Sequence, residues 1–480
     1  MGVFRRWSRR LPEAAAIGGA AVVLVYFLFV PPLIGLADSG DFLRVMSTVG
    51  LYYGMSEQNR DMLFFGYFHH LYRWDPKFFT NGGYVSTQVP LLALAVYAER
   101  MFTRDGWFDI RWLSAVYAVS FVTACALLMW MLRREAAAVR WTAALVVLFV
   151  FADLGYVAYF NSFYGEPVAF LSTLFLVLTV VALVSREKPP VRLLAAYFVA
   201  AAWLAGSKLQ YTPAALPFAV AGWMFSRLRP DDRRFRVTAR IGAVAVVVCA
   251  AVVFAANPSG LKHINLYQSV FFGILRESND PQADLRELGL DPKLAVNAGY
   301  HYFQPAPIPQ ESEEMKQLFY SRVSHADVVL FYLRHPDRLI RNVFKAAEGA
   351  FMIKPGYLGN YEPSAGKPYG AVSTAWSFWS DFKKHVVPHH IGTIALVFGL
   401  FAVSATRVLL KARAMGRTRT AMAAAFWLAF AADGLLQLVV PIVADGFADI
   451  EKHLFLFNVS FDVIVAVSAV VTVRTLARAW

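Results

Sequence analysis

The sequence predicts an all-α polytopic membrane protein with about ten transmembrane helices. Hydrophobic residues make up 58% of the 480-residue chain, charged residues only 16%, and the mean hydropathy is +0.47. Long uncharged runs recur along the chain, and basic residues gather in the short segments between them. A soluble globular protein of this length does not have such a composition.

The first element is an uncharged run from Ala14 to Ala37, which is long enough to cross about 30 Å of hydrocarbon. It is too long for the apolar part of a cleaved signal peptide, so we expect a retained first helix. The run ends on Asp38, and Asp41 follows after the turn residues Ser39 and Gly40. A helix starting there would place Asp38 at its cap and Asp41 in its first turn, at the membrane surface. Either carboxylate could deprotonate a substrate, and the alternative is that Asp38 only caps the helix.

Ten apolar runs are predicted to span the membrane. They are 14–36, 112–132, 141–160, 167–185, 191–206, 210–226, 241–256, 391–410, 421–443 and 454–473. An eleventh run, 87–98, is short and contains Pro90. We therefore expect Val89 to Met101 to form a helix on the outer membrane surface.

The distribution of basic residues predicts the orientation. Six short segments hold 23 of the 46 lysine and arginine residues but only four of the 33 acidic residues; they are 1–10, 133–140, 186–192, 227–240, 407–419 and 474–480. Because cytoplasmic loops are enriched in basic residues, these segments and both termini should be cytoplasmic. The basic pI of 9.6 is then a consequence of topology, and no nucleic-acid partner is expected. Two cysteines in apolar runs provide neither a disulfide framework nor a metal cluster.

This topology divides the chain into three parts. Residues 1–256 form an N-terminal transmembrane catalytic module of seven spans with an outer loop at 37–111, 257–389 form a small extracytoplasmic lobe, and 390–480 carry three further spans. Within the lobe we expect helices over Ala326 to Phe351, broken at His335-Pro336, and an aromatic amphipathic stretch from Thr374 to Phe382 on the membrane surface.

A second polar constellation, Asn161-Ser-Phe-Tyr164-Gly-Glu166, lies where the third span ends and the fourth begins. The topology places Glu166 on the same side as Asp38 and Asp41, so these acids should share one cavity, although a helix-capping role alone would also explain Glu166. Lys208 lies in an outer turn, where its ammonium could bind a substrate phosphate or a lipid headgroup.

The stretch before the last span carries Asp445, Asp449, Lys452 and His453. Asp449 and His453 are four residues apart, so a helix would bring them together. Weaker candidates in the outer regions are His69, His70, Lys262, His263, Arg276 and Glu277.

Several of these motifs resemble those of a known superfamily. They are Asp38-Ser-Gly-Asp41-Phe, Gln88-Val-Pro-Leu-Leu, Leu132-Arg-Arg, Asn161-Ser-Phe-Tyr-Gly-Glu166 and Lys452-His-Leu-Phe. Their layout is similar to the GT-C superfamily, which are integral-membrane glycosyltransferases that use polyprenyl-phosphate sugars, and most similar to bacterial glycan-biosynthesis hexose transferases. The resemblance covers about the first 260 residues. Asp-x-x-Asp replaces the family's Asp-Glu or Asp-x-Asp, which leaves open which acid is the base and whether a divalent cation binds.

The resemblance implies an inverting hexosyltransferase of the bacterial inner membrane with an extracytoplasmic active site. Its partners would be a polyprenyl-phosphate sugar donor, a glycan or lipid-linked acceptor, and membrane lipids. Asp41, or else Asp38, would be the base and Glu166 would orient the base or the acceptor. Lys208 would hold the phosphate with Lys452, His453 or Arg276, while Asn161, Tyr164 and Asp449 would bind substrate. A phosphate ester leaves without a general acid, and direct displacement inverts the anomeric centre.

Two other functions remain open from the sequence. A transporter or flippase of lipid-linked sugars would require ionisable groups at mid-membrane depth and repeated broken helices, whereas these acids lie at the ends of spans. An O-antigen-ligase-like enzyme would share the large outer loop, but would not require an acidic pair directly after its first span.

Overall fold

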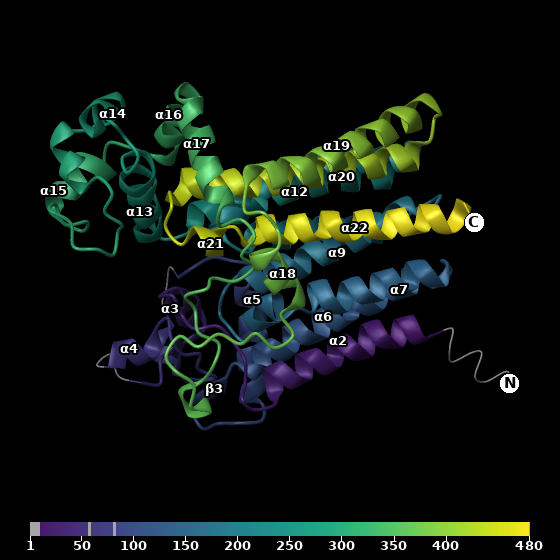
Figure 1. Cartoon of the computed structure of the whole chain (residues 1–480), viewed down its shortest axis with the longest axis horizontal. Coiled ribbons are helices and arrows are strands. Elements are labelled where there is room, and N and C mark those ends of the chain that lie inside the picture. Colours follow the sequence, from purple (N-terminus) through teal and green to yellow (C-terminus); the bar gives the residue numbers. More distant parts are fainter. Residues whose placement is uncertain (1–9, 56–58, 80–82, 480) are drawn as a thin grey trace.

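A computed structural model of the chain describes residues 10–55, 59–79 and 83–479. Long helices run side by side in a bundle, and shorter elements gather at one end of it (Figure 1). The beginning of helix α2 (Leu11–Phe29) and the end of helix α22 (Phe455–Ala479) both lie at the opposite end. The first and last helices of the described chain therefore begin and end on the same side of the bundle, as an even number of spans requires.

Seven of the described helices are long and apolar enough to cross a membrane. They are α2, α6 (Arg111–Leu132), α9 (Glu166–Val184), α12 (Arg233–Ala256), α19 (Ile391–Ala414), α20 (Thr418–Asp445) and α22. A bent pair, Ala137–Phe151 and Leu154–Phe160, meets the same criterion if it is one span, with 52° between its halves; it contains α7 (Ala137–Val146) and α8 (Leu154–Val157). The chain is thus an all-α polytopic membrane protein, as predicted.

The remaining two predicted spans are shorter helices. The run 191–206 forms α10 (Val191–Gly206), and the run 210–226 forms a 3₁₀ segment, Leu209–Ala214, followed by α11 (Ala215–Met224). Pro213 lies in the 3₁₀ segment, where a missing backbone N–H is tolerated more easily than inside an α-helix.

The first apolar run does not form one helix up to residue 36. Helix α2 ends at Phe29, and Pro31 and Pro32 follow, each of which disfavours helical geometry in the residue before it. The chain then runs extended, and the backbone N–H groups of Gly35 and Ala37 donate to the carbonyl oxygens of Asn360 and Gly359 at 3.1 and 3.0 Å. This pairing fixes the position of Asp38.

The outer loop after α2 contains short helices and a small sheet. The helices are α3 (Phe42–Met46), α4 (Arg60–Leu63) and α5 (Val89–Arg100), and the strands are β1 (Leu51–Tyr52), β2 (Leu71–Trp74) and β3 (Trp107–Asp109). The strands form an antiparallel sheet in the order β1-β2-β3, in the register Leu51 with Trp74 and Leu71 with Asp109. The helix expected over Val89 to Met101 is confirmed as α5, and its place on the outer membrane surface stays a prediction, whereas the sheet was not predicted.

Residues 257–389 form a group of short helices beside the bundle (Figure 1). They are α13 (Ser259–Tyr267), α14 (Pro281–Glu287), α15 (Glu313–Met315), α16 (His325–Arg334), α17 (Pro336–Ala347) and α18 (Phe378–His385). The predicted helix break at His335-Pro336 is confirmed, because α16 ends directly before it and α17 starts on the proline. The last short helix, α21 (Ile450–His453), lies between α20 and α22.

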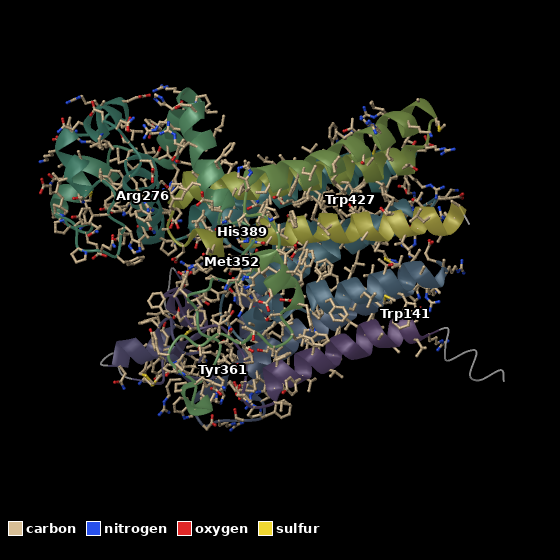
Figure 2. All side chains as sticks on the ribbon, in the orientation of Figure 1. Trp141, Arg276, Met352, Tyr361, His389 and Trp427 are labelled. Atoms are coloured by element: carbon tan, nitrogen blue, oxygen red, sulfur yellow. The ribbon has the colours of Figure 1, made fainter. Side chains whose placement is uncertain are left out.

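A buried polar network joins α18 to the bundle. The Lys383 ammonium lies 2.8 Å from the Asp462 carboxylate and 2.6 Å from the side-chain oxygen of Asn458, both in α22, and the Tyr156 hydroxyl donates to Asp462 at 2.5 Å. Lys383 and Asp462 are fully buried. Polar atoms are otherwise concentrated in the short elements and at the ends of the long helices, as the side chains in Figure 2 show.

Candidate active site

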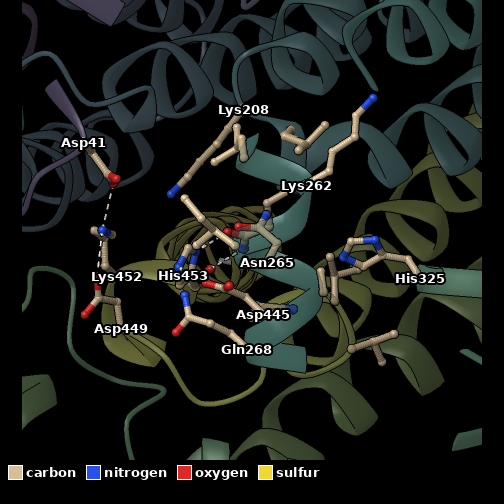
Figure 3. Close-up of a pocket in the computed structure, with 18 of the residues that line it drawn as sticks. Asp41, Lys208, Lys262, Asn265, Gln268, His325, Asp445, Asp449, Lys452 and His453 are labelled. Atoms are coloured by element: carbon tan, nitrogen blue, oxygen red, sulfur yellow. Dashed lines mark hydrogen bonds and ion pairs between the residues drawn. The ribbon is translucent and has the colours of Figure 1, made fainter. Parts of the chain in front are cut away.

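A cavity of about 1220 Å³ opens where the long helices meet the short elements. Polar side chains from distant parts of the chain line it, among them Asp41, Lys208, Gln268 and His453 (Figure 3). An apolar wall continues from them; it includes Phe254, Leu261, Val329, Leu333, Val440 and Val443. All three predicted parts of the chain therefore contribute to the cavity, and not only residues 1–256.

Asp38 is buried beside the cavity and holds the turn that leads to Asp41. Its Oδ1 accepts the backbone N–H groups of Gly40, Asp41 and Phe42 at 2.7, 2.8 and 3.1 Å, and its other oxygen accepts the Tyr53 hydroxyl. Burial raises the pKa of Asp38 to about 6, although the hydrogen bond from Tyr53 acts in the opposite direction. Helix α3 starts at Phe42 with Asp41 at its N-cap, so the prediction that Asp38 caps the helix and that Asp41 lies in its first turn is wrong. Asp38 instead closes the turn that precedes the helix.

Asp41 lines the cavity and lies between two cations. Its Oδ1 is 3.1 Å from Arg44 in α3, and its Oδ2 is 2.9 Å from the Lys452 ammonium. Burial by itself would raise the pKa of Asp41, but Arg44 and Lys452 outweigh burial and hold this pKa well below its usual range. Asp41 is therefore ionised at neutral pH.

The Lys452 ammonium is surrounded by oxygen atoms. It lies 2.9 Å from Asp41, 3.0 Å from the Ser39 hydroxyl and 3.1 Å from Asp449, and its side chain is only 2% exposed (Figure 3). Three acceptors match the three protons of an ammonium group. Lys452 therefore fixes the position of the Asp41 carboxylate.

Glu166 and Lys208 form a buried ion pair. The Lys208 ammonium is 2.9 Å from Glu166 Oε1, and the side chains are 8% and 0% exposed. Lys208 lines the large cavity, and both residues line a smaller adjacent cavity together with Asp41 and Arg44. The structure thus brings Asp41 and Glu166 together, whereas Asp38, which was predicted to share their cavity, lines neither cavity. Of the two alternatives for Lys208, burial of its side chain against Glu166 favours a ligand in the cavity over a lipid headgroup.

Asn161 and Tyr164 brace the first acidic motif. The Asn161 amide donates to the carbonyl oxygens of Leu28 and Ile34 at 3.2 and 2.8 Å, and Asn161 is fully buried away from both cavities. The Tyr164 hydroxyl donates to the Ala37 carbonyl at 2.9 Å and accepts the Ser39 N–H at 2.8 Å. These contacts are with the protein itself, so in this structure both residues position the turn that carries Asp41.

His453 is held by two residues that precede it in sequence. Its Nδ1 lies 2.6 Å from Gln210 Oε1 and its Nε2 lies 2.9 Å from Asp445 Oδ2. Burial, with the nearby ammonium groups of Lys208 and Lys452, lowers the pKa of His453 well below its usual value. The expected side-chain pairing of Asp449 with His453 is not found in the described structure, because Asp449 lies before α21 in a left-handed conformation and binds Lys452 instead.

The weaker candidates are spread over the surface elements. Arg276 is 3.9 Å from Glu277 and packs over Phe272 and Phe447, outside the residues that line the cavity (Figure 2). His70 pairs with Glu362, His69 bonds the Met62 carbonyl, Glu277 pairs with Lys345 and His263 stacks on Tyr320. Of this group, Lys262 lines the cavity.

Sequence reasoning missed several polar side chains that line the cavity, and four of them are Arg44, Tyr84, Asn265 and Gln268. Arg44 lies over the Tyr84 ring at 5.2 Å while it pairs with Asp41. The spacing of Asp41 and Arg44, three residues apart at a predicted helix start, was a signal that could have identified Arg44. The other three lie in loops or helices that carry no local signal.

The described residues contain no group of three or more His, Cys, Asp or Glu side chains placed to hold a metal ion. In a comparison with protein families, the family described as YfdI N-terminal transmembrane domain matches residues 5–479 of the chain. No curated protein and no solved structure matches it.

Proposed function

The chain belongs to the family of the YfdI N-terminal transmembrane domain, and on that premise we propose that it is an inverting glycosyltransferase of the bacterial inner membrane. It would move a hexose from a polyprenyl-phosphate donor to a glycan or lipid-linked acceptor. In the proposed topology both termini are cytoplasmic and the cavity faces the extracytoplasmic side, as the distribution of basic residues favours.

One observation carries this proposal: a single cavity combines an ionised carboxylate and cations with an apolar wall. Asp41, Arg44 and Lys208 form its ionic end, while residues of α12, α13, α16 and α20 form the apolar wall. A polyprenyl-phosphate sugar has the same division, because a long hydrocarbon chain is joined through a phosphate to a polar sugar. The hydrocarbon chain of the donor would pack against the apolar side chains, and its phosphate would lie beside the cations.

Asp41 is the proposed base. The acceptor hydroxyl attacks the anomeric carbon, the bond from that carbon to the phosphate oxygen breaks, and the hydroxyl proton passes to the Asp41 carboxylate. A base must be within reach of its substrate before its pKa matters. Asp41 lines the cavity, whereas Asp38 does not.

Lys208 and Arg44 are the proposed phosphate ligands. Glu166 is the hydrogen-bond acceptor of the Lys208 ammonium among the described residues, so two of its three N–H groups are free to reach a ligand. Lys452 is fully engaged by Ser39, Asp41 and Asp449, and its proposed role is to position Asp41. The phosphate acquires a second negative charge as it leaves, and Lys208 and Arg44 would stabilise that charge.

A transporter or flippase of lipid-linked sugars is the alternative. Asp433, buried in the middle of α20 beside Gln437 at 3.1 Å, is the kind of intramembrane carboxyl that such proteins use. The two functions leave the donor in different states: a transferase breaks the bond between sugar and phosphate, whereas a transporter moves an intact donor across the bilayer.

The test follows the sugar label. The purified chain in nanodiscs is given polyprenyl-phosphate hexose labelled in the sugar, together with a lipid-linked oligosaccharide fraction. We expect covalent label in the acceptor and an equal amount of released polyprenyl phosphate, with none in a sample given boiled protein. Intact donor in nanodiscs, with protein-dependent movement of donor across liposomes, would contradict the proposal.

A further inference from the structure

A group of uncharged and acidic side chains lies next to the ionic end of the cavity. Asn265 in α13 and Gln268 just after it are three residues apart, so they share one face of their helix. Asp445 at the end of α20 and His453 line the same cavity beside them (Figure 3). This group itself contains no lysine or arginine, unlike the end formed by Asp41, Arg44 and Lys208. Lys262, one turn before Asn265, also lines the cavity, but its ammonium donates to the Ala255 carbonyl at 2.9 Å.

These side chains have hydrogen-bonding capacity that the protein does not use. Gln268 is 4% exposed, and within the described residues its Oε1 has no hydrogen-bond partner. Asp445 is 7% exposed; its Oδ2 faces His453, but its Oδ1 has no partner in the same part of the chain. A buried polar atom without a partner costs about 1–3 kcal/mol. A ligand that satisfied these groups would therefore be favoured.

The chemistry of the group selects hydroxyls. A carboxamide offers both donors and acceptors, and because its terminal torsion turns easily, either side of it can face the cavity. The Asp445 carboxyl group adds oxygen atoms that can accept hydrogen bonds. A sugar hydroxyl both donates and accepts, so it matches a mixed group of this kind, whereas an ionised phosphate has only acceptors.

The position of the group matches the covalent structure of the donor. The Lys208 ammonium is near enough to His453 to lower the pKa of its imidazole, and His453 in turn contacts Asp445 at 2.9 Å. In a polyprenyl-phosphate sugar the hexose is attached directly to the phosphate. A phosphate at Lys208 would therefore place the hexose against the neighbouring side chains.

We propose that Asn265, Gln268 and Asp445 form the subsite that binds the hydroxyl groups of the donor hexose. The subsite rests on the proposed function, because the phosphate at Lys208 is what places the sugar there. Asn265 and Gln268 are then specificity-determining residues, which select among hexoses by the orientation of their hydroxyls.

A bare lipid and sugar-bearing lipids that otherwise match it test this subsite. Dissociation constants are measured in nanodiscs for bare decaprenyl phosphate and for decaprenyl phosphate carrying glucose, galactose or mannose. We expect Asn265→Leu and Gln268→Met each to weaken binding of the preferred sugar-bearing lipid by roughly 3- to 10-fold, the loss of one hydrogen bond, and to leave the bare lipid unchanged. Gln317→Met, at an exposed glutamine of the same lobe, is the matched control and should change neither.

The outcomes separate this subsite from the proposed function. If the unaltered protein binds both lipids but the two variants change both constants equally, or change neither, the sugar subsite is wrong while the donor class stands. If the unaltered protein binds neither lipid, the proposed donor is wrong and the subsite falls with it. Lys208→Met should weaken both lipids, which confirms that the bare lipid reports on the phosphate position.

Discussion

Removal of one partner from the Lys208–Glu166 pair should destabilise the protein strongly. The pair joins two long helical segments through a 2.9 Å contact, and Glu166 is fully buried with its Oε2 unpaired in the described structure. Lys208→Met would leave a carboxylate with no partner on either oxygen. Breaking such a buried pair costs about 3–5 kcal/mol, whereas an exposed pair contributes less than about 1 kcal/mol.

The assay is reversible unfolding by SDS in mixed micelles, with Lys316→Met as the control. Lys316 lies 2.7 Å from Glu313, and both side chains are more than half exposed, so this substitution should change the free energy of unfolding very little. Adding Glu166→Gln to Lys208→Met should restore most of the lost stability, because the unpaired charge is gone. Donor binding should stay weak in this double variant, since the phosphate ligand is still missing.

An unchanged free energy of unfolding in Lys208→Met would refute the reasoning. It would mean that water or another protein group satisfies the Glu166 carboxylate once the lysine is gone. Recovery of donor binding together with stability in the double variant would also count against the role of Lys208 as a phosphate ligand.

Three further predictions concern topology, pH and the interior. Cysteines at Ser278 and Ser364 should react with an impermeant thiol reagent from outside the cell and a cysteine at Arg234 should not; the reverse pattern would contradict the orientation. Because the folded protein holds the Asp38 proton up to about pH 6, the free energy of unfolding should fall by roughly 2 kcal/mol between pH 4 and pH 6, and Asp38→Asn should abolish this slope. Lys383→Met should cost about 3–5 kcal/mol by leaving buried Asp462 unpaired, and a cost below 1 kcal/mol would contradict the ion pair.

The sequence was most informative where the signal was local. Apolar runs and charge bias predicted the helices of the bundle, and Pro90 and Pro336 predicted the short surface helices, because hydrophobic length and proline geometry act over a few residues. The same reasoning placed the end of α2 too late, since a continuous apolar run does not reveal that its last residues pair with the carbonyl oxygens of Gly359 and Asn360.

The partners of the charged residues could not be predicted, because they are distant in sequence. Lys452 binds Asp41, which is 411 residues away in the sequence, and Lys208 binds Glu166, which is 42 residues away. From the sequence each lysine was a candidate for the phosphate; the hydrogen bonds distinguish them, since Lys452 has three acceptors and Lys208 has one. The two carboxamides, Asn265 and Gln268, carried no pattern at all, and only the cavity identifies them.

The central claim is that Asp41 is the base of a transfer from a polyprenyl-phosphate hexose. The most direct test measures turnover and donor affinity separately for Asp41→Asn and for Asp38→Asn in nanodiscs. We predict that Asp41→Asn lowers turnover by about 10²- to 10⁴-fold and leaves donor affinity nearly unchanged, because the substitution keeps the shape but removes the base. Full turnover in Asp41→Asn would contradict the account, and so would a loss that occurs only in Asp38→Asn.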